Sequence, residues 1–247
     1  MISKNKAKYI KSLHDKKFRS EYEEFLVEWK KSLEELLKSD FEILDLFISK
    51  DFYDSNRDLL NDVEFEICEI DEITKVSTLK TNSDWIALVR QKQNKELQNN
   101  NSETILVLDE IKDPWNLWTI IRIADWYWIK KIIASSNTVE FYNPKVIISS
   151  MWSFCRTQIY YTDLKQYLEK QKMPIYWAFL GWEDLHKTSL DSNSFLVIWN
   201  ESNWISSEIE KLVTKKITIP RFGWAESLNA WIATWIIIDN IKRFNWQ

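Results

Sequence analysis

The sequence contains very little glycine. Two glycines occur among 247 residues, whereas ordinary usage of about 7 % would place roughly 17 in a chain of this length. Glycine enters the positive-φ region freely, so this chain has few residues suited to the turns that need it. Tryptophan is in excess, with 15 residues. The surplus of tryptophan nearly matches the deficit of glycine. The stretch DPWNLWTIIRIADWYW (113–128) places indoles beside turn and helix-cap residues.

Cysteine and histidine are also scarce. Cys68 and Cys155 form neither a disulfide framework nor a metal-ligand spacing, so we interpret them as buried free thiols and expect no metal site. His14 and His186 lie outside every motif. No apolar run reaches the roughly 18 residues that span a bilayer, and the basic N-terminal stretch lacks the apolar core of a secretory signal. These absences predict a cytoplasmic protein without a membrane segment.

The overall charge does not indicate nucleic-acid binding, because the chain carries a formal net charge of −4. Any contact with RNA must therefore use a local patch, and the first 31 residues contain an excess of lysine and arginine. The hydrophobic content of 45 % and the charged content of 28 % are globular values. The length is enough for one or two domains with a sizeable core.

Two α/β domains are predicted from the order of the apolar patterns. Residues 1–92 alternate strand and helix patterns and form a small α/β domain. The stretch 93–103 is polar and rich in Asn and Gln, which is the composition of a linker. Residues 104–247 contain six strand patterns separated by helical ones, which predicts a doubly wound parallel sheet. The expected strands are 104–111, 129–135, 157–162, 174–180, 194–202 and 215–220.

Three polar loops follow strands of this second domain. They are DEIKDPWN (109–116), IWNESNW (198–204) and IPRFGWAESLN (219–229). Ligands of open parallel sheets bind past the carboxyl ends of the strands. The sequence therefore predicts that these three loops form the binding site.

The three loops resemble the motifs of one enzyme family. The family motif N-x-G-x-x-x-R-x-A stands here as NLWTIIRIA (116–124), L-V-x-G-x-E-x-x-G as LVIWNESNW (196–204), and I-P-x-x-G-x-x-x-S-L-N as IPRFGWAESLN (219–229). Three motifs in the same order and spacing resemble the SpoU class of TrmH-like SPOUT RNA 2′-O-ribose methyltransferases. The first half is similar to the ribosomal-protein-L30e-like substrate-binding domain of such enzymes, with FLVEW (25–29) at a usual FLVEG site.

The resemblance implies a fold, a cofactor and partners. The fold is a parallel-sheet SPOUT domain with a trefoil knot, preceded by a small L30e-like α/β domain. The cofactor is S-adenosylmethionine, the substrate is rRNA or tRNA, and the chain forms a homodimer through the knot region. Two alternatives remain open on the same fold: a non-catalytic RNA-binding protein and a ribosome-assembly protein.

The resemblance also implies roles for individual residues. Polar residues of the three motifs are catalytic: Asn116, Arg122, Glu201, Ser227 and Asn229. The second and third motifs bind the cofactor: Trp199, Asn200, Ile219, Pro220, Gly223, Leu228 and Asn229. Arg122 engages the ribose hydroxyl or the adjacent phosphate, and because a guanidinium hardly ever loses its proton, we favour positioning and stabilisation of the developing alkoxide. Asn116 orients Arg122 or the ribose, Glu201 holds the arginine and the second loop, and Ser227 and Asn229 contact substrate or cofactor.

Tryptophan replaces glycine throughout these motifs. Trp118, Trp199 and Trp204 stand at motif glycines, and Gly223 alone remains. Further tryptophans stand where such enzymes commonly carry glycine: Trp29, Trp85, Trp115, Trp128 and Trp152, with Trp231 and Trp235 as additional candidates. We hypothesise that UGA codons read as glycine in the living cell have been translated as tryptophan. The alternative is that the tryptophans are genuine and form core or an RNA-stacking surface.

Overall fold

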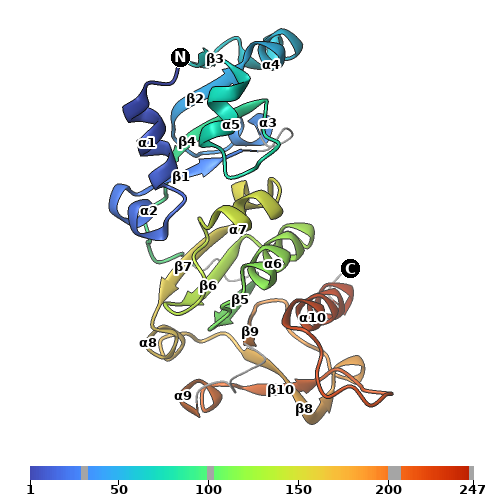
Figure 1. Cartoon of the computed structure of the whole chain (residues 1–247). Coiled ribbons are helices and arrows are strands. Elements are labelled where there is room, and N and C mark those ends of the chain that lie inside the picture. The colour runs from blue at the N-terminus through green and yellow to red at the C-terminus, as the bar shows by residue number, and fades with distance from the viewer. Residues whose placement is uncertain (29–32, 99–102, 200–206, 245–247) are drawn as a thin grey trace. The chain divides into compact units, whose positions relative to one another are not determined.

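The computed structural model describes residues 1–28, 33–98, 103–199 and 207–244, and the chain divides into two compact units (Figure 1). Unit 1 comprises Met1–Gln93 and Phe141–Cys155; unit 2 comprises Asn94–Glu140 and Arg156–Gln247. The break after Gln93 coincides with the start of the predicted linker. Residues 141–155, which the sequence analysis places in the second domain, belong to unit 1.

An aromatic cluster explains this assignment. The ring of Tyr142 lies 4.5 Å from that of Phe25, and the ring of Phe154 lies 5.9 Å from that of Phe41. Phe25 and Phe154 are fully buried. A short aromatic segment that lies far along the chain thus completes the core of unit 1. No local periodicity in the sequence indicates this packing.

Unit 1 is built around a mixed sheet with the strand order β1-β4-β2-β3. β4 is antiparallel to both β1 and β2, and β2 is parallel to β3. The described strands are β1 (Glu24–Val27), β2 (Ile43–Ser49), β3 (Glu66–Cys68) and β4 (Trp85–Arg90). The described helices are α1 (Lys4–Ser12), α2 (Lys16–Tyr22), α3 (Leu33–Leu37), α4 (Lys50–Ser55), η1 (Arg57–Leu60), α5 (Ile70–Val76), α7 (Pro144–Ser149) and η2 (Ser153–Cys155). The described residues of unit 1 therefore form a mixed α/β structure.

A buried carboxylate holds one loop of unit 1 in place. Glu28 is 1 % exposed and follows β1 directly. Its carboxylate accepts hydrogen bonds from the Thr78 amide (2.9 Å), from Asn82 Nδ2 (3.3 Å) and from the hydroxyls of Ser77 and Thr78. A buried charge is tolerated because it is multiply hydrogen-bonded, and here the donors come from residues about fifty positions away in the chain.

Replacing Glu28 by alanine is expected to lower the free energy of unfolding by about 2–4 kcal/mol, because several buried donors lose a charged acceptor. Urea unfolding monitored by circular dichroism measures this change. Glu28→Gln, which keeps the size and one acceptor oxygen, should lose less. Equal stability of the alanine variant and the parent would show that the network contributes nothing to the fold.

Unit 2 contains a six-stranded sheet with the order β10-β8-β9-β5-β6-β7, and every recorded pairing within it is parallel. This confirms the predicted doubly wound parallel sheet. The strands are β5 (Thr104–Asp109), β6 (Lys131–Ser135), β7 (Gln158–Thr162), β8 (Ile175–Asp184), β9 (Ser194–Trp199) and β10 (Lys215–Thr218). The described helices are α6 (Pro114–Trp126), α8 (Leu164–Leu168), η3 (Leu185–Lys187), α9 (Ser207–Glu210) and α10 (Ala230–Phe244).

The helices of unit 2 cover both faces of the sheet (Figure 1). Ile105 and Val107 of β5 face a core cluster that includes Leu164 of α8 and Ile209 of α9. On the other face, α6 and α10 contact each other, and α10 contacts β9. β5 is buried on both faces, which is why its sequence is continuously apolar rather than alternating.

Strand β8 carries a pronounced irregularity near its carboxyl end. The register with β10 changes from Lys216↔Trp177 to Ile217↔Glu183. Gly181, one of the two glycines, lies in this bulge with φ +83°, a backbone conformation that L side chains rarely adopt. The chain has thus retained glycine at a position where the backbone requires it.

Within the described residues, no helix combines the length and the apolar character that crossing a membrane demands. Cys68 and Cys155 are both buried free thiols, as the sequence analysis expects. No cluster of three or more His, Cys, Asp or Glu side chains suited to a metal ion occurs in the described part of the chain.

Candidate active site

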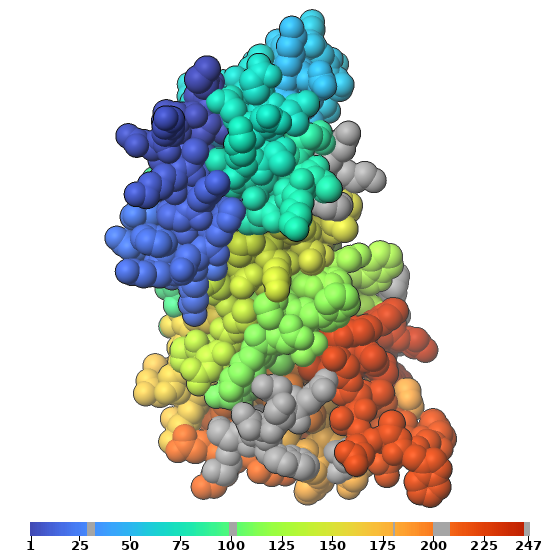
Figure 2. Space-filling model, in the orientation of Figure 1, coloured from blue at the N-terminus to red at the C-terminus, as the bar shows by residue number. Residues whose placement is uncertain are grey.

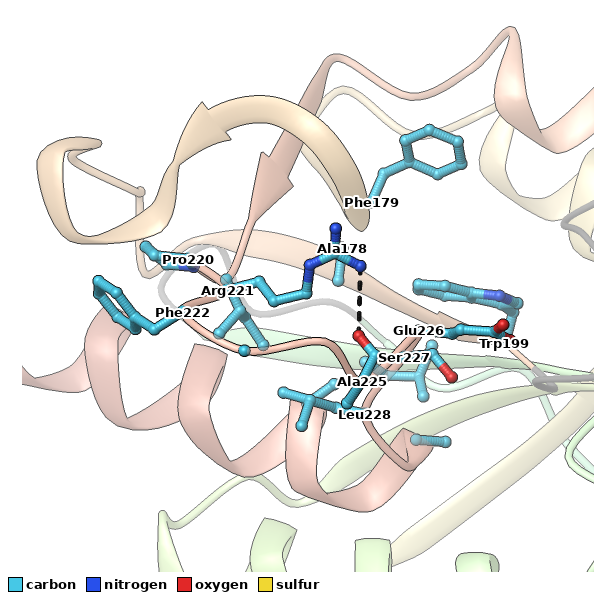
Figure 3. A pocket seen from close by; sticks show the side chains of 15 residues that line it. Ala178, Phe179, Trp199, Pro220, Arg221, Phe222, Ala225, Glu226, Ser227 and Leu228 are labelled. Carbon is cyan, nitrogen blue, oxygen red and sulfur yellow. Dashed lines mark hydrogen bonds between the residues drawn. The ribbon is translucent and has the colours of Figure 1, made fainter.

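A cavity of about 540 Å³ opens at the carboxyl-end edge of the unit 2 sheet (Figure 3). Four segments line it: the middle of β8, the end of β9, the loop that follows β10, and the first turn of α10. Its volume lies in the range of ordinary small-molecule sites, about 300–1,000 Å³. The site therefore lies where parallel sheets bind their ligands.

Six of the residues assigned to the site by resemblance line this cavity. Trp199 closes it from the end of β9, and the loop after β10 contributes the others: Ile219, Pro220, Gly223, Ser227 and Leu228. The second and third motifs, about twenty residues apart in the sequence, thus meet at one site.

The cavity wall is mostly apolar, with one charge of each sign. Arg221 donates a hydrogen bond from Nη1 to the Ala225 carbonyl at 3.2 Å, so its guanidinium extends along the cavity wall (Figure 3). Glu226 follows in the same loop, and both side chains are exposed. Apolar walls with a few convergent polar groups are typical of sites that bind a mixed apolar and charged ligand.

Asn229 fixes the loop to the helix that follows it. Its Oδ1 accepts a hydrogen bond from the Trp231 amide at 3.0 Å, and its carbonyl accepts one from the Ala233 amide at 3.0 Å. This is helix N-capping at the start of α10. Asn229 itself does not line the cavity, so the structure gives it a capping contact beside the cavity wall.

Asn116 and Arg122 lie on α6, outside the cavity lining. α6 begins with Asp113 as N-cap, whose side chain accepts from the Trp115 amide, and with Pro114 in its first turn. The Oδ1 atom of Asn116 is buried and has no hydrogen-bond partner among the residues that the structure describes. Arg122 is exposed, and its guanidinium lies 5.6 Å from the centre of the Trp118 ring.

The strand register brings the first and second motif loops to the same edge. Asp109, the last residue of β5, is paired with Trp199, the last residue of β9. Both loops therefore leave the sheet side by side. Asn200, Glu201 and Trp204 lie outside the described residues.

Part of the cavity wall was not predicted from the sequence. Ala178 and Phe179 of β8 and Ala230 and Ala233 of α10 also line it. Ala178 and Phe179 fall at the carboxyl end of the expected strand 174–180. They could have been predicted, because ligands of parallel sheets bind near the carboxyl ends of the strands. The alanines of α10 are small residues at a helix start, a pattern too common to single out.

Comparison with known proteins places the chain in a family. Residues 103–239 match the SpoU rRNA methylase family, and residues 4–87 match the MRM3-like substrate binding domain. The chain belongs to the SpoU rRNA methylase family. This confirms the resemblance that the three motifs indicate, and the enzyme class is that of RNA methyltransferases.

Individual relatives extend the likeness over nearly the whole chain. The 23S rRNA (guanosine(2553)-2'-O)-methyltransferase RlmP of Bacillus subtilis is 25 % identical over 241 residues, covering 96 % of each chain. A putative RNA methyltransferase of the TrmH family from Porphyromonas gingivalis has a TM-score of 0.86 and 28 % identity, covering 98 % of this chain and 99 % of that one. An AdoMet-bound rRNA methyltransferase from Sinorhizobium meliloti has a TM-score of 0.86 at 22 % identity, covering 98 % and 97 %, and shows the shared SPOUT fold.

Proposed function

We propose that this SpoU methylase acts in the cytoplasm and transfers a methyl group from S-adenosylmethionine to a ribose 2′-hydroxyl of ribosomal or transfer RNA. The observation that supports this most directly is the cavity formed by the second and third motifs at the carboxyl ends of parallel strands. The full-length likeness to a 23S rRNA 2′-O-methyltransferase supports the same reaction.

Apart from the Trp199 indole, the cavity suits such a cofactor in chemical character, and its volume lies in the range of small-molecule sites. Its apolar residues, among them Phe179, Ile219 and Leu228, offer a surface for a nucleoside base, and Arg221 and Glu226 offer complements for a zwitterionic amino-acid tail. The cofactor supplies an electrophilic methyl group on a sulfonium. The indole of Trp199 reduces the space at the end of β9, where a glycine would admit the ligand to the main chain.

The role of Arg122 in the reaction is to position the acceptor and stabilise charge. Its guanidinium offers five donors and stays protonated, so it can hold a phosphate and a ribose oxygen together while negative charge develops on that oxygen. Its exposure on α6 leaves it accessible to RNA. The nearby Trp118 ring competes for the guanidinium through a cation–π contact.

Asn116 is assigned to the ribose rather than to Arg122. Six residues separate them on α6, which places their side chains about 120° apart around the helix axis. The Oδ1 atom of Asn116 has no hydrogen-bond partner among the described residues, and a rotation of the side chain that exposes it would let it accept a hydrogen bond from a substrate hydroxyl. Ser227, in the third motif, contributes a hydroxyl from the cavity wall.

A transfer assay tests the proposed reaction. Incubation of total RNA with radiolabelled S-adenosylmethionine should place label in RNA, and the labelled linkage should resist alkaline cleavage because a methylated 2′-oxygen cannot attack the adjacent phosphate. Label in alkali-sensitive positions would indicate base methylation instead. RNA binding without any transfer would favour the non-catalytic alternative.

We further propose that the enzyme is a homodimer with a knotted catalytic domain. Large apolar side chains are exposed in the third motif: Phe222 at 98 % and Trp224 at 99 %. Large apolar side chains exposed together on one loop are typical of interaction sites in soluble proteins. Analytical ultracentrifugation should report a mass of two chains. The trefoil knot stays a prediction of the family resemblance.

We also propose that many of the tryptophans are glycines in the living cell, and the end of α6 supports this. Trp128 has φ +60°. The Ile129 amide donates to the Ala124 carbonyl at 2.8 Å, and the Trp128 amide donates to the Asp125 carbonyl at 3.1 Å. These two bonds define a Schellman motif in which Trp128 occupies the left-handed position that is usually glycine. In addition, the indole N–H groups of Trp85 and Trp177 are buried and find no acceptor within the described part of the chain.

Two neighbouring exposed tryptophans give opposite expectations. Trp128→Gly should raise the free energy of unfolding by about 1 kcal/mol, because glycine adopts the left-handed conformation without a steric cost. Trp126→Gly, at the last helical position of α6, should lower it by about 0.5 kcal/mol through weaker helix propensity. Thermal unfolding measures both. The recoding proposal would be refuted if neither substitution raised the free energy of unfolding and the gene carried UGG codons for these tryptophans.

A further inference from the structure

We infer that the outward face of α1 binds the phosphate backbone of RNA, an inference that rests on the proposed function and gives unit 1 its substrate contact. The surface consists of Lys4, Lys8 and Lys11, which we call the α1 lysine face. Residues 1–20 contain seven Lys or Arg and one Asp, a formal charge of +6, in a chain whose total is −4. This segment therefore carries a local net positive charge within a chain that is acidic overall.

Helix geometry presents these three lysines together. Lys4, Lys8 and Lys11 fall within about 60° of arc on a 3.6-residue helix. The opposite face of α1 is buried: Ile10 is fully buried and belongs to the core cluster of unit 1. All three lysines are exposed (Figure 2 shows α1 in dark blue on the surface). The helix is thus held by its apolar side and offers its basic side to solvent.

The charges on this face are not neutralised by the protein. No acidic side chain within 4 Å of Lys4, Lys8 or Lys11 is recorded for the described residues, whereas Lys6, on another face of α1, pairs with Asp45. The single acidic residue of the segment, Asp15, is engaged as N-cap of α2, where it accepts from the Lys17 amide at 2.8 Å. Lysines without carboxylate partners exert their full charge on a ligand.

The spacing suits a nucleic-acid strand. From Lys4 to Lys11 the helix rises about 10 Å, which corresponds to the axial rise of about three nucleotides at roughly 3.4 Å each in a DNA duplex. Lys16 and Lys17, both exposed at the start of α2, continue the basic surface beyond α1. The chemistry is that of non-specific phosphate contact, which fixes orientation without reading bases.

The test measures binding of labelled RNA without cofactor. The probes are a polyuridylate strand and a duplex hairpin of the same length, followed by fluorescence anisotropy. Lys4→Ala, Lys8→Ala, Lys11→Ala combined should weaken binding about 10- to 100-fold at low salt and reduce the slope of log affinity against log salt by about 2. The triple arginine variant should bind like the parent. The alanines favour helix at least as well as lysine, so α1 should stay folded.

A matched control removes three exposed lysines elsewhere: Lys38, Lys50 and Lys170. This control changes the net charge equally and should leave the affinity near that of the parent. Equal binding and equal salt slope for the parent and the α1 triple variant would overturn the inference. The inference would also be overturned if the parent bound phosphatidylserine vesicles but did not bind RNA. Failure of the proposed reaction shows instead as an absence of methyl transfer by a chain that still binds RNA through α1.

Discussion

Replacing Arg122 by alanine is expected to reduce kcat for RNA methylation by about 100-fold or more, which is the usual effect of removing a group that stabilises charge in a transition state. The comparison should use a parent chain with glycine at positions 118, 199 and 204, so that the tryptophans do not mask the effect. Arg122 does not line the cavity. The affinity for S-adenosylmethionine should therefore be unchanged, and the loss should appear in kcat alone or in kcat together with the KM for RNA.

Two variants sharpen this result. Arg122→Lys keeps the charge but not the forked donor geometry, and should recover only part of the activity. Arg243→Ala, an exposed arginine of α10 that pairs with Asp239, serves as the matched control and should be nearly neutral. An Arg122→Ala enzyme with unchanged kcat would remove Arg122 from the mechanism and leave the positioning of the acceptor without an assigned residue.

The second large effect is expected at the cofactor cavity. Trp199→Gly, combined with Trp204→Gly, should strengthen S-adenosylmethionine binding at least about tenfold, or about 1.4 kcal/mol. The physical reason is space: the Trp199 indole forms part of the cavity wall and contacts Trp177 edge to face, with ring centres 5.5 Å apart. Isothermal titration calorimetry measures the affinity directly, and the chain with both tryptophans should bind weakly or not at all.

A neighbouring tryptophan supplies the control. Trp224 is 99 % exposed and does not line the cavity. Trp224→Gly makes the same chemical change in the same motif loop and should leave the cofactor affinity unaltered. Equal affinity of the parent and the Trp199→Gly, Trp204→Gly variant would show that the indole leaves the site intact, and would count against glycine as the native residue there.

The strand pattern and the three motifs led to the correct architecture because each depends on local chemistry. The continuously apolar run of β5 indicates a strand buried on both faces, and it is central in the sheet. Asn143 and Pro144 indicate a helix start, and the Asn143 side chain caps α7 by accepting from the Lys145 amide. The motif residues around 219–229 indicate a site at a strand end, and most of them line the cavity.

Other features arise only from tertiary packing. The membership of residues 141–155 in unit 1 depends on the rings of Phe25, Phe41, Tyr142 and Phe154, which are brought together from distant positions. The bulge of β8 at Gly181 depends on its register against β10. Neither feature leaves a periodic pattern in the sequence, because each results from contacts between segments that lie far apart in the chain.

The sequence by itself determined the order of strands and helices, the family of the chain and the concentration of positive charge in its first twenty residues, because periodicity, motif spacing and charge are local properties of the chain. The tertiary structure decided which motif residues meet. It gathered the second and third motifs around one cavity and placed Asn116 and Arg122 on a helix beside it. It also placed Trp128 in a left-handed turn. Those outcomes depend on how the strand ends align in the parallel sheet and how the helices end against it, which no single stretch of sequence specifies.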